Sequence, residues 1–339
     1  ETWGSCDAGA VQKVTLKNSK GTAASISTLG ATLVDFVFNG TNVVLGFDSA
    51  QEYFERKKVP YAGATCGRVA NRIGFAKFEL DGKGYDVSAN LPPHHLHGGH
   101  IGWTNQIWAV GSVEATKVVL NLTSPAGEEG FPGTVTASTE YSLSEDDELT
   151  VTMRAETDAP TPVNMAHHSY WNLNGDNNGD VKGHVLRLHA SHWTDTDADS
   201  IPTGRLNKVQ GTCMDFTDPT PIGQRIADPF LETTKGYDHN YCVGGDPDAE
   251  GMRPVAELRG DRTGITLHLS SNMPGVQLYT SNFVTPTTGR GGAPYNQHQA
   301  ACLETQHFPD AVNHAEFPSN ILRPQTKYIH KMVHRLTAA

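Results

Sequence analysis

The feature that most constrains the fold of this chain is a recurring pattern of short segments in which apolar and polar residues alternate. Examples are residues 33–38, 118–122, 149–153 and 265–269. Side chains on a β-strand point alternately to opposite faces, so a period of two is typical of half-buried strands. Helical periodicity is nearly absent, and residues 50–57 are the one short segment that we expect to form a helix.

Turn signals separate these segments. Residues 33–38 end at Asn39-Gly40, and residues 78–80 are followed by Asp81-Gly82, which are dipeptides that favour tight β-hairpins. The chain shows no internal repeat and no linker-like break in composition. We therefore expect an all-β fold with very little helix, in which residues 1–339 form one large antiparallel β-sandwich domain.

The charge of the chain excludes some classes of partner. Thirty-seven acidic residues outnumber 26 basic ones, giving a formal net charge of −11, and no Lys/Arg run is present. A nucleic acid or an anionic membrane surface is therefore not expected as a partner, whereas a neutral small molecule is. No apolar run approaches the roughly 20 residues that a membrane-spanning helix needs.

The compartment stays open between cytoplasmic and secreted. The chain begins at Glu1 rather than Met, it shows no signal peptide, and it contains sequons at Asn39 and Asn121. The cysteines are far apart, odd in number and without a CxxC pair, which disfavours a disulfide scaffold or a zinc ribbon but leaves one or two disulfides open. They are Cys6, Cys66, Cys213, Cys242 and Cys302.

The common cofactor and hydrolase motifs are missing from the sequence. It contains no Walker A loop, no GxGxxG after a strand, no HExxH and no GxSxG. Nucleotide cofactors and serine-hydrolase chemistry therefore lose most of their support. Five polar clusters remain as candidates for a functional site.

The first two clusters combine cations, an amide and histidines. Residues 67–73 carry two arginines and Asn71, which form either a solvated strand end or a set of hydrogen-bond donors for a ligand. Residues 92–100 carry four histidines, so a metal site must be considered. No carboxylate lies between Asp86 and Glu114, and we therefore favour a catalytic or sugar-binding histidine over a metal ligand or a plain surface loop.

The other three clusters carry a histidine among aromatic residues and two carboxylates. If residues 164–173 form an alternating strand, His168 and Tyr170 share one face, where the histidine is either a satisfied core residue or the proton donor of a sugar site. Asp238 stands between aromatic residues, where it is either structural or an acceptor for two vicinal hydroxyls. Glu304 follows an apolar Cys-Leu pair, and beside isolated histidines it is a candidate general base.

These five clusters, in this order, resemble the aldose 1-epimerase (galactose mutarotase) family. The resemblance extends from Ala31 to Pro324 and includes residues 127–133 and 274–280. It implies a large antiparallel β-supersandwich, the galactose mutarotase-like fold. It also implies an enzyme that interconverts the α and β anomers of free aldohexoses such as galactose and glucose, without a cofactor or a metal.

The resemblance also implies roles for individual residues. Glu304 is similar to the family's general base and His168 to its general acid, while His97 is similar to a partner at the ring or C1 oxygen. The remaining candidates resemble substrate-binding residues. They are Asn71, Arg72, Asp238, Gln277 and Tyr170.

Several points stay open at this stage. The family commonly has Asn and Ser or Thr where His94 and His95 stand, and Asn where His167 stands, so the preferred aldose is not determined. The alternatives are an isomerase for a non-sugar lactol or a phosphorylated sugar, and a non-catalytic sugar-binding module on the same fold. We expect a monomer or a weak homodimer.

Overall fold

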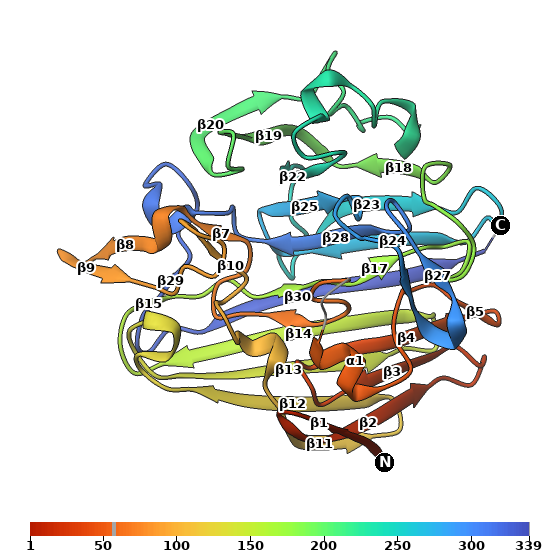
Figure 1. Cartoon of the computed structure of the whole chain (residues 1–339), viewed down its shortest axis with the longest axis horizontal. Helices are drawn as coiled ribbons and strands as arrows, with labels where there is room; N and C mark the ends of the chain where they lie inside the picture. The colour runs from red at the N-terminus through yellow and green to blue at the C-terminus, as the bar shows by residue number, and fades with distance from the viewer. Residues whose placement is uncertain (56–58, 339) are drawn as a thin grey trace.

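The protein is built almost entirely from antiparallel β-strands (Figure 1). The computed structural model describes residues 1–55 and 59–338. In this part of the chain one α-helix occurs, α1 (Ala50–Glu55), which begins where the sequence predicts it; residues 56–58 lie outside the described residues. None of the helices described is long and apolar enough to cross a bilayer. The expected all-β class is confirmed.

Three large sheets contain most of the strands. The first has the order β11 (Ala109–Glu114), β12 (Lys117–Ser124), β13 (Val135–Leu143), β14 (Glu148–Thr157), β30 (Tyr328–Thr337), β24 (Thr266–Ser271), β23 (Arg253–Arg259), β18 (Val185–Leu188) and β21 (Thr220–Pro221). The second has the order β17 (Tyr170–Trp171), β28 (Ala301–Gln306), β25 (Gly275–Tyr279), β22 (Asp238–Val243), β19 (Ala190–Thr196) and β20 (Pro202–Lys208). The third has the order β1 (Thr2–Cys6), β2 (Gly9–Lys17), β3 (Ala23–Ser27), β4 (Thr32–Phe38) and β5 (Thr41–Asn42).

Short pairs and 3₁₀ turns connect these sheets. The two-stranded pairs are β6 (Thr65–Cys66) with β16 (Ala166–His167), β7 (Arg72–Ile73) with β10 (His95–Leu96), β8 (Lys77–Leu80) with β9 (Lys83–Asp86), β15 (Thr161–Pro162) with β29 (Ile321–Leu322), and β26 (Thr287–Thr288) with β27 (Pro294–Tyr295). The 3₁₀ turns are η1 (Gly74–Ala76), η2 (Trp103–Asn105), η3 (Glu128–Gly130), η4 (Ile222–Gln224), η5 (Pro229–Leu231), η6 (Arg290–Gly292) and η7 (Ala311–Asn313).

Both predicted hairpins are present. Asn39 and Gly40 join β4 to β5, with φ values of 49° and 77°, and Asp81 and Gly82 join β8 to β9, with φ values of 53° and 77°. Two consecutive residues with positive φ are what a type I′ turn requires, and Asn-Gly and Asp-Gly adopt it with little strain. The hairpin prediction is confirmed.

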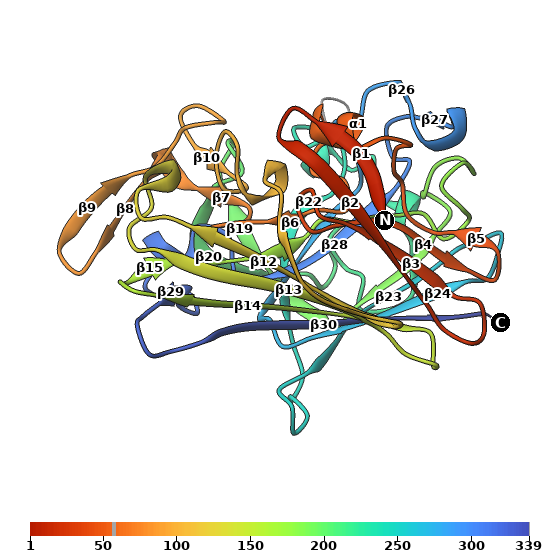
Figure 2. The same cartoon turned by 90° about the horizontal axis from the view of Figure 1, so that it is seen from below.

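The apolar core lies between the sheets. Alternate residues of β12, such as Val118 and Leu120, join the same buried cluster as Val276 and Leu278 of β25 and Leu303 of β28. Burial of this apolar surface is the main stabilising contribution to a sandwich of this kind. The third sheet closes one side, where β2 and β3 contact β12 and β13 (Figure 2).

The strands β25 and β28 are buried on both faces. Their odd and even positions therefore have different surroundings: Leu303 faces the apolar core, whereas Glu304 faces a pocket on the other side of the sheet. A carboxylate in such a strand is removed from water, and this raises its pKa because burial disfavours the charged form. The second sheet thus carries the polar side chains of the candidate site on the face opposite to the core.

The cysteines do not form a disulfide in this fold. All five lie within the described residues and are free thiols. Cys66, Cys213 and Cys302 are buried, whereas Cys6 and Cys242 are half-buried. The option of one or two disulfides, which the sequence leaves open, is not used here.

Candidate active site

The register of the second sheet brings together residues that lie far apart in the sequence. Asp238 of β22 is opposite Tyr279 of β25, and Gln277 of β25 is opposite Glu304 of β28. Directly opposed residues in an antiparallel pair have their side chains on the same face. Asp238, Gln277 and Glu304 therefore share one surface.

The same register explains why His168 meets Glu304. Tyr170 of β17 is opposite Cys302 of β28, and the two strands are antiparallel. His168, two residues before Tyr170, therefore lies toward Glu304, two residues after Cys302. The His168 Nε2 atom lies 3.5 Å from the Glu304 Oε1 atom. The segment is not one continuous strand, because β16 ends at His167 and β17 begins at Tyr170. The predicted alternation of faces is nevertheless present: the His168 ring stacks on Tyr170, and the His167 Nε2 atom hydrogen-bonds the Ser169 hydroxyl at 2.7 Å.

All eight residues predicted from the sequence line one pocket of about 340 Å³. This volume lies at the lower end of the range for small-molecule sites. The pocket lies between the second sheet and the turn that carries β7 and β10. Its lining consists of Pro60, Tyr61, Asn71, Arg72, Leu91, Leu96, His97, His168, Tyr170, Asp238, Gln277, Tyr279, Phe283 and Glu304.

Glu304 is the most perturbed carboxyl group of the pocket. Its residue is 2 % exposed, and its Oε2 atom has no hydrogen-bond partner among the described residues. Burial raises the pKa of the Glu304 carboxyl well above its usual value of 4.5; the Asp238 carboxylate raises it further, and Arg72 lowers it. A carboxyl group with a raised pKa is a stronger base once it is deprotonated, so Glu304 is suited to accept a proton near neutral pH.

His97 is held as a neutral donor. Its Nδ1 atom accepts a hydrogen bond from the Asn71 backbone N–H at 3.2 Å, which leaves the proton on Nε2. Burial lowers the pKa of His97 well below 6.5, and the charges of His168 and Arg72 lower it further. The rings of His97 and His168 are 5.3 Å apart, so both imidazoles face the same small volume.

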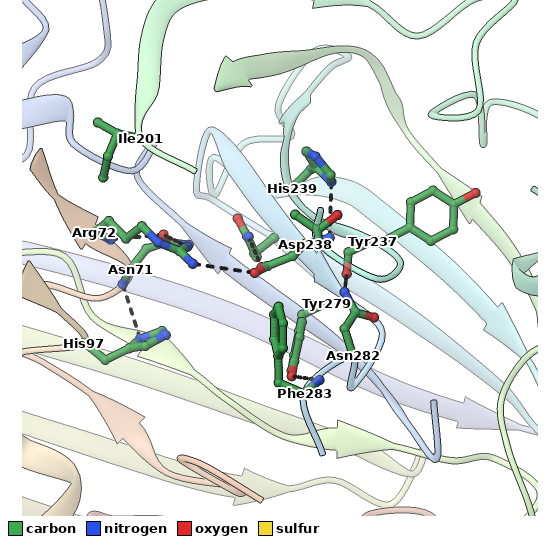
Figure 3. A network of polar contacts seen from close by, with 12 residues as sticks. Asn71, Arg72, His97, Ile201, Tyr237, Asp238, His239, Tyr279, Asn282 and Phe283 are labelled. Atoms are coloured by element: carbon green, nitrogen blue, oxygen red, sulfur yellow. Dashed lines mark hydrogen bonds and ion pairs between the residues drawn. The ribbon is translucent and has the colours of Figure 1, made fainter. Parts of the chain in front are cut away.

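Arg72 and Asp238 face each other on the pocket wall (Figure 3). Gln277 joins them in a polar network. The Gln277 amide donates to Asp238 Oδ1 at 2.7 Å, and the Arg72 guanidinium lies 3.7 Å from Asp238 Oδ2. The Asn71 Oδ1 atom accepts from the Arg72 backbone N–H at 3.0 Å. These contacts fix the direction of a carboxylate and a guanidinium that together can both accept from and donate to a polar ligand.

The pocket also has aromatic walls that the sequence analysis did not assign. Tyr61 packs against His97 with ring centroids 4.5 Å apart, and Tyr279 stacks on Phe283 with centroids 6.4 Å apart. Tyr279 lies two residues after Gln277 on the same strand, so the period of two could have found it. Tyr61 and Phe283 come from loops, where the alternation gives no signal.

Both interpretations of Arg68 that the sequence allows need correction. Arg68 is not a ligand-binding partner of Arg72: it is 2 % exposed, and its guanidinium donates to the backbone oxygens of Pro132 and Gly133 at 2.8 and 2.9 Å. It is also not a solvated strand end. The carbonyl groups that bind this arginine belong to a loop more than 60 residues away, so residues 67–73 alone do not predict the contact.

The four histidines of residues 92–100 do not converge. His94 Nδ1 accepts from the Phe75 backbone N–H at 3.0 Å, and His95 Nδ1 contacts the Ser88 carbonyl oxygen at 2.8 Å. His100 is exposed, and only His97 lines the pocket. The interpretation of this segment as a shaped loop with one functional histidine fits the structure.

Comparisons with known proteins identify the family. A sequence profile described as aldose 1-epimerase matches residues 12–335. The chain belongs to the aldose 1-epimerase family. It is 37 % identical over 329 residues to a galactose mutarotase from Bos taurus, covering 95 % of this chain and 93 % of that protein. It is 32 % identical over 323 residues to an aldose 1-epimerase from Escherichia coli K12, covering 93 % and 92 % of the two chains.

The solved structures agree with this assignment. A GalM/aldose epimerase homologue from C. elegans superposes with a TM-score of 0.89 at 28 % identity, covering 97 % of this chain and all of that chain. The predictions of family, of the galactose mutarotase-like fold and of an isomerase acting on carbohydrates are therefore confirmed. The roles of the individual residues stay predictions.

One cluster in the epimerase pocket resembles a metal site in composition. His97, His168 and Glu304 each offer a ligand atom, and these atoms lie within 4.8 Å of one another. Two features disfavour a cation there: the raised pKa of Glu304 keeps its proton to higher pH, and the Arg72 charge acts on both Glu304 and His97. The residues therefore fit acid–base chemistry better than metal ligation.

We expect the epimerase to work without a resident metal. Dialysis against EDTA should leave the rate of anomer exchange within about two-fold of its starting value, because proton transfer by side chains needs no Lewis acid. The measurement is the rate before and after dialysis, with the metal content determined by elemental analysis. Activity that is lost on dialysis and restored by zinc would contradict the prediction.

Proposed function

We propose that the substrates are free aldohexoses such as galactose and glucose, that Glu304 is the general base and that His168 is the general acid. The single observation that carries this proposal is the 3.5 Å contact between these two buried side chains at the bottom of the pocket. A base and an acid so close to each other can act on two oxygens bound to the same carbon. Those oxygens are the hydroxyl and the ring oxygen at C1 of a sugar.

The proposed reaction opens and closes the hemiacetal ring. Glu304 takes the proton from the C1 hydroxyl, the bond between C1 and the ring oxygen breaks, and His168 gives a proton to that oxygen. The open aldehyde turns about the C1–C2 bond, and the ring closes on the other face with the two roles reversed. No atom is gained or lost, and each positioned proton transfer contributes about 10²–10⁴-fold to the rate.

The other pocket residues are proposed to hold the sugar. The neutral His97 donates from Nε2 to the ring oxygen or the C1 oxygen. Asp238 accepts hydrogen bonds from two neighbouring hydroxyls, and Arg72 and Gln277 donate to others. Among the described residues that line the pocket Arg72 is the only Lys or Arg, and it already faces Asp238, which favours a neutral sugar over a phosphorylated one.

The proposal is tested by an NMR measurement of anomer exchange with galactose, glucose and one sugar phosphate. Magnetisation transfer between the two anomeric protons gives the exchange rate directly. We expect fast exchange of both free sugars and an exchange of the phosphate close to the uncatalysed rate. A preference for the phosphate would favour the phosphorylated-sugar alternative, and binding without exchange would indicate a non-catalytic module.

We expect sedimentation to show a monomer or a weak homodimer.

Asp238 should control both sugar affinity and the pH profile. In Asp238→Asn two charge-assisted hydrogen bonds to hydroxyls weaken, so KM should rise by a factor equivalent to about 1.5–3 kcal/mol. The Asp238 charge also raises the pKa of Glu304, so its removal should move the acidic limb of kcat/KM to lower pH. Steady-state kinetics between pH 4 and 8 measure both effects.

Arg72 provides the opposite control, because its charge lowers the pKa of Glu304. Arg72→Gln should therefore move the acidic limb to higher pH while it also raises KM. If Asp238→Asn abolished kcat at an unchanged KM, the division of roles between Asp238 and Glu304 would be wrong.

A further inference from the structure

The turn that presents Asn71 and Arg72 to the pocket has an uncommon backbone conformation. Asn71, Phe75 and Ala76 have φ values of 59°, 52° and 51°. Residues other than glycine in this left-handed region are strained, and they persist only where the surroundings hold them. The surroundings of this turn should therefore contain groups that hold it.

Asp310 is bonded to this turn on both sides of Ile73, the residue that follows Arg72. The Asp310 backbone N–H donates to the Arg72 carbonyl oxygen at 3.0 Å. The Gly74 backbone N–H donates to the Asp310 Oδ1 atom at 3.0 Å. Asp310 is 6 % exposed, so water competes little for these two bonds. One residue thus fixes the main chain immediately before and after Ile73.

The Asp310 carboxylate is itself held in place. The Asn313 amide donates to Oδ1 at 2.7 Å, and the His314 Nε2 atom lies 3.6 Å from Oδ2. A Cβ atom on Gly74 would lie 3.0 Å from Asp310 Oδ2 and 3.2 Å from the Cγ2 atom of Ile201, which Figure 3 draws near Arg72. The carboxylate therefore fits closely against the turn, and a Cβ atom at Gly74 would require its neighbours to shift by a few tenths of an ångström.

Asp310 does not line the pocket, and it lies six residues after Glu304. We propose that Asp310 is a positioning residue for sugar binding, which holds the turn of residues 71–76 so that the Arg72 guanidinium reaches Asp238 and the sugar. This inference rests on the proposed binding role of Arg72. Asp310 acts through Arg72, and the segment that carries the base thereby also fixes one wall of the pocket.

The test compares three variants. Asp310→Ala removes the acceptor for Gly74, so KM for galactose should rise about ten-fold with kcat within about three-fold of wild type. Asp310→Asn keeps an acceptor oxygen, so KM should stay within about three-fold. Gly74→Ala requires the carboxylate to shift by a few tenths of an ångström and should raise KM in the same direction as Asp310→Ala, which gives a second measurement if Asp310→Ala does not fold. The Kd of 1-deoxygalactose, a sugar that cannot open, should follow KM.

A double-mutant cycle separates this role from a general structural one. Adding Asp310→Ala to Arg72→Ala should change KM by less than about two-fold, because the group through which Asp310 acts is already gone. Asp147 is the matched control: it is a buried carboxylate, 8 % exposed, that accepts from Asn18 and Thr22 at 2.7 Å far from the pocket. Asp147→Ala should lower thermal stability and leave KM unchanged.

Three results would overturn the inference: an unchanged KM in Asp310→Ala, effects of Asp310→Ala and Arg72→Ala that multiply in full, or an Asp310→Asn variant as impaired as Asp310→Ala. Failure of the underlying proposal is distinguishable from these. If Arg72→Ala alone left KM unchanged, the binding role of Arg72 would be wrong, and the inference would fall with it. An effect of Arg72→Ala without one of Asp310→Ala would remove the inference alone.

Discussion

Glu304→Gln should lower kcat by at least about 10²-fold, the usual contribution of a general base. The amide has nearly the shape of the carboxylate but cannot accept the C1 proton. The change removes no apolar contact and opens no cavity, so the protein should fold. The measurement is the rate of anomer exchange by NMR at saturating galactose. A folded variant that keeps more than about a tenth of the wild-type kcat would refute the assignment of Glu304 as the base.

The same substitution should make the protein more stable at neutral pH. The folded pKa of Glu304 is raised above its unfolded value of 4.5, so the unfolded chain releases this proton at lower pH than the folded protein does. The part of the folding stability that depends on Glu304 is therefore fully present below pH 4.5, and it is lost as the pH rises toward the pKa of Glu304 in the folded protein. Gln does not ionise, and Glu304→Gln should melt at a higher temperature than wild type at pH 7 but not at pH 4. Lost activity with gained stability would exclude misfolding.

His168→Asn completes this prediction. It should also lower kcat severely, because the ring oxygen loses its proton donor. The double variant should be scarcely slower than the slower single variant, since groups that act as a unit are not additive. The His168 and Glu304 side chains lie 3.5 Å apart, which is the distance expected of such a unit. Independent, multiplying effects would mean that the two residues serve different steps.

The sequence predicts the fold class well because an alternating pattern reports directly on one local property, the face to which a side chain points. The hairpins at Asn39-Gly40 and Asp81-Gly82 follow from the preferences of two residues. The candidate site required more. Local patterns indicated the polar clusters, the resemblance to a family singled out eight of the fourteen residues that line the pocket, and no local pattern would have paired Gln277 with Glu304.

The parts that the sequence did not predict depend on contacts between distant segments. Arg68 and Arg72 stand four residues apart in similar surroundings, yet one is buried by carbonyl groups and the other faces Asp238. The role proposed for Asp310 depends on a bond to Gly74, 236 residues away. The partner of each of these side chains depends on which distant segment lies beside it once the sheets have paired, and the local sequence does not specify this.

The second large effect concerns histidines that are buried behind the pocket, in the core between the sheets. His167, His330 and His334 are 2 %, 0 % and 1 % exposed. The Thr305 hydroxyl hydrogen-bonds His330 at 2.7 Å, and the rings of His167 and His334 are 5.6 Å apart. His167 precedes His168 in the chain and packs against His334, and His330 contacts Thr305, which follows Glu304, so a charge here would disturb the site as well as the core.

We expect the protein to lose stability steeply below pH 6.5. Burial lowers the pKa of His330 to about 3 and of His334 to about 4, and it lowers that of His167 well below 6.5. Between pH 6.5 and these values the unfolded chain binds protons that the folded protein does not, so stability falls with falling pH. Each of these histidines lowers the free energy of unfolding by up to about 1.4 kcal/mol per pH unit as the pH falls, so the three together lower it by up to about 4 kcal/mol per pH unit.

Urea unfolding at pH 7, 6 and 5 measures this loss. A typical domain is stable by about 5–15 kcal/mol, so the midpoint should fall sharply over this range. Glu304 acts in the opposite direction, because acid restores the stability that its burial removes, but it is one group against several histidines whose pKa burial lowers. His334→Gln should reduce the slope by up to about 1.4 kcal/mol per pH unit, whereas the same change at the exposed His100 should not alter it. A stability that stays constant between pH 7 and 5 would show that these histidines take up protons in the folded protein over the same pH range as in the unfolded chain.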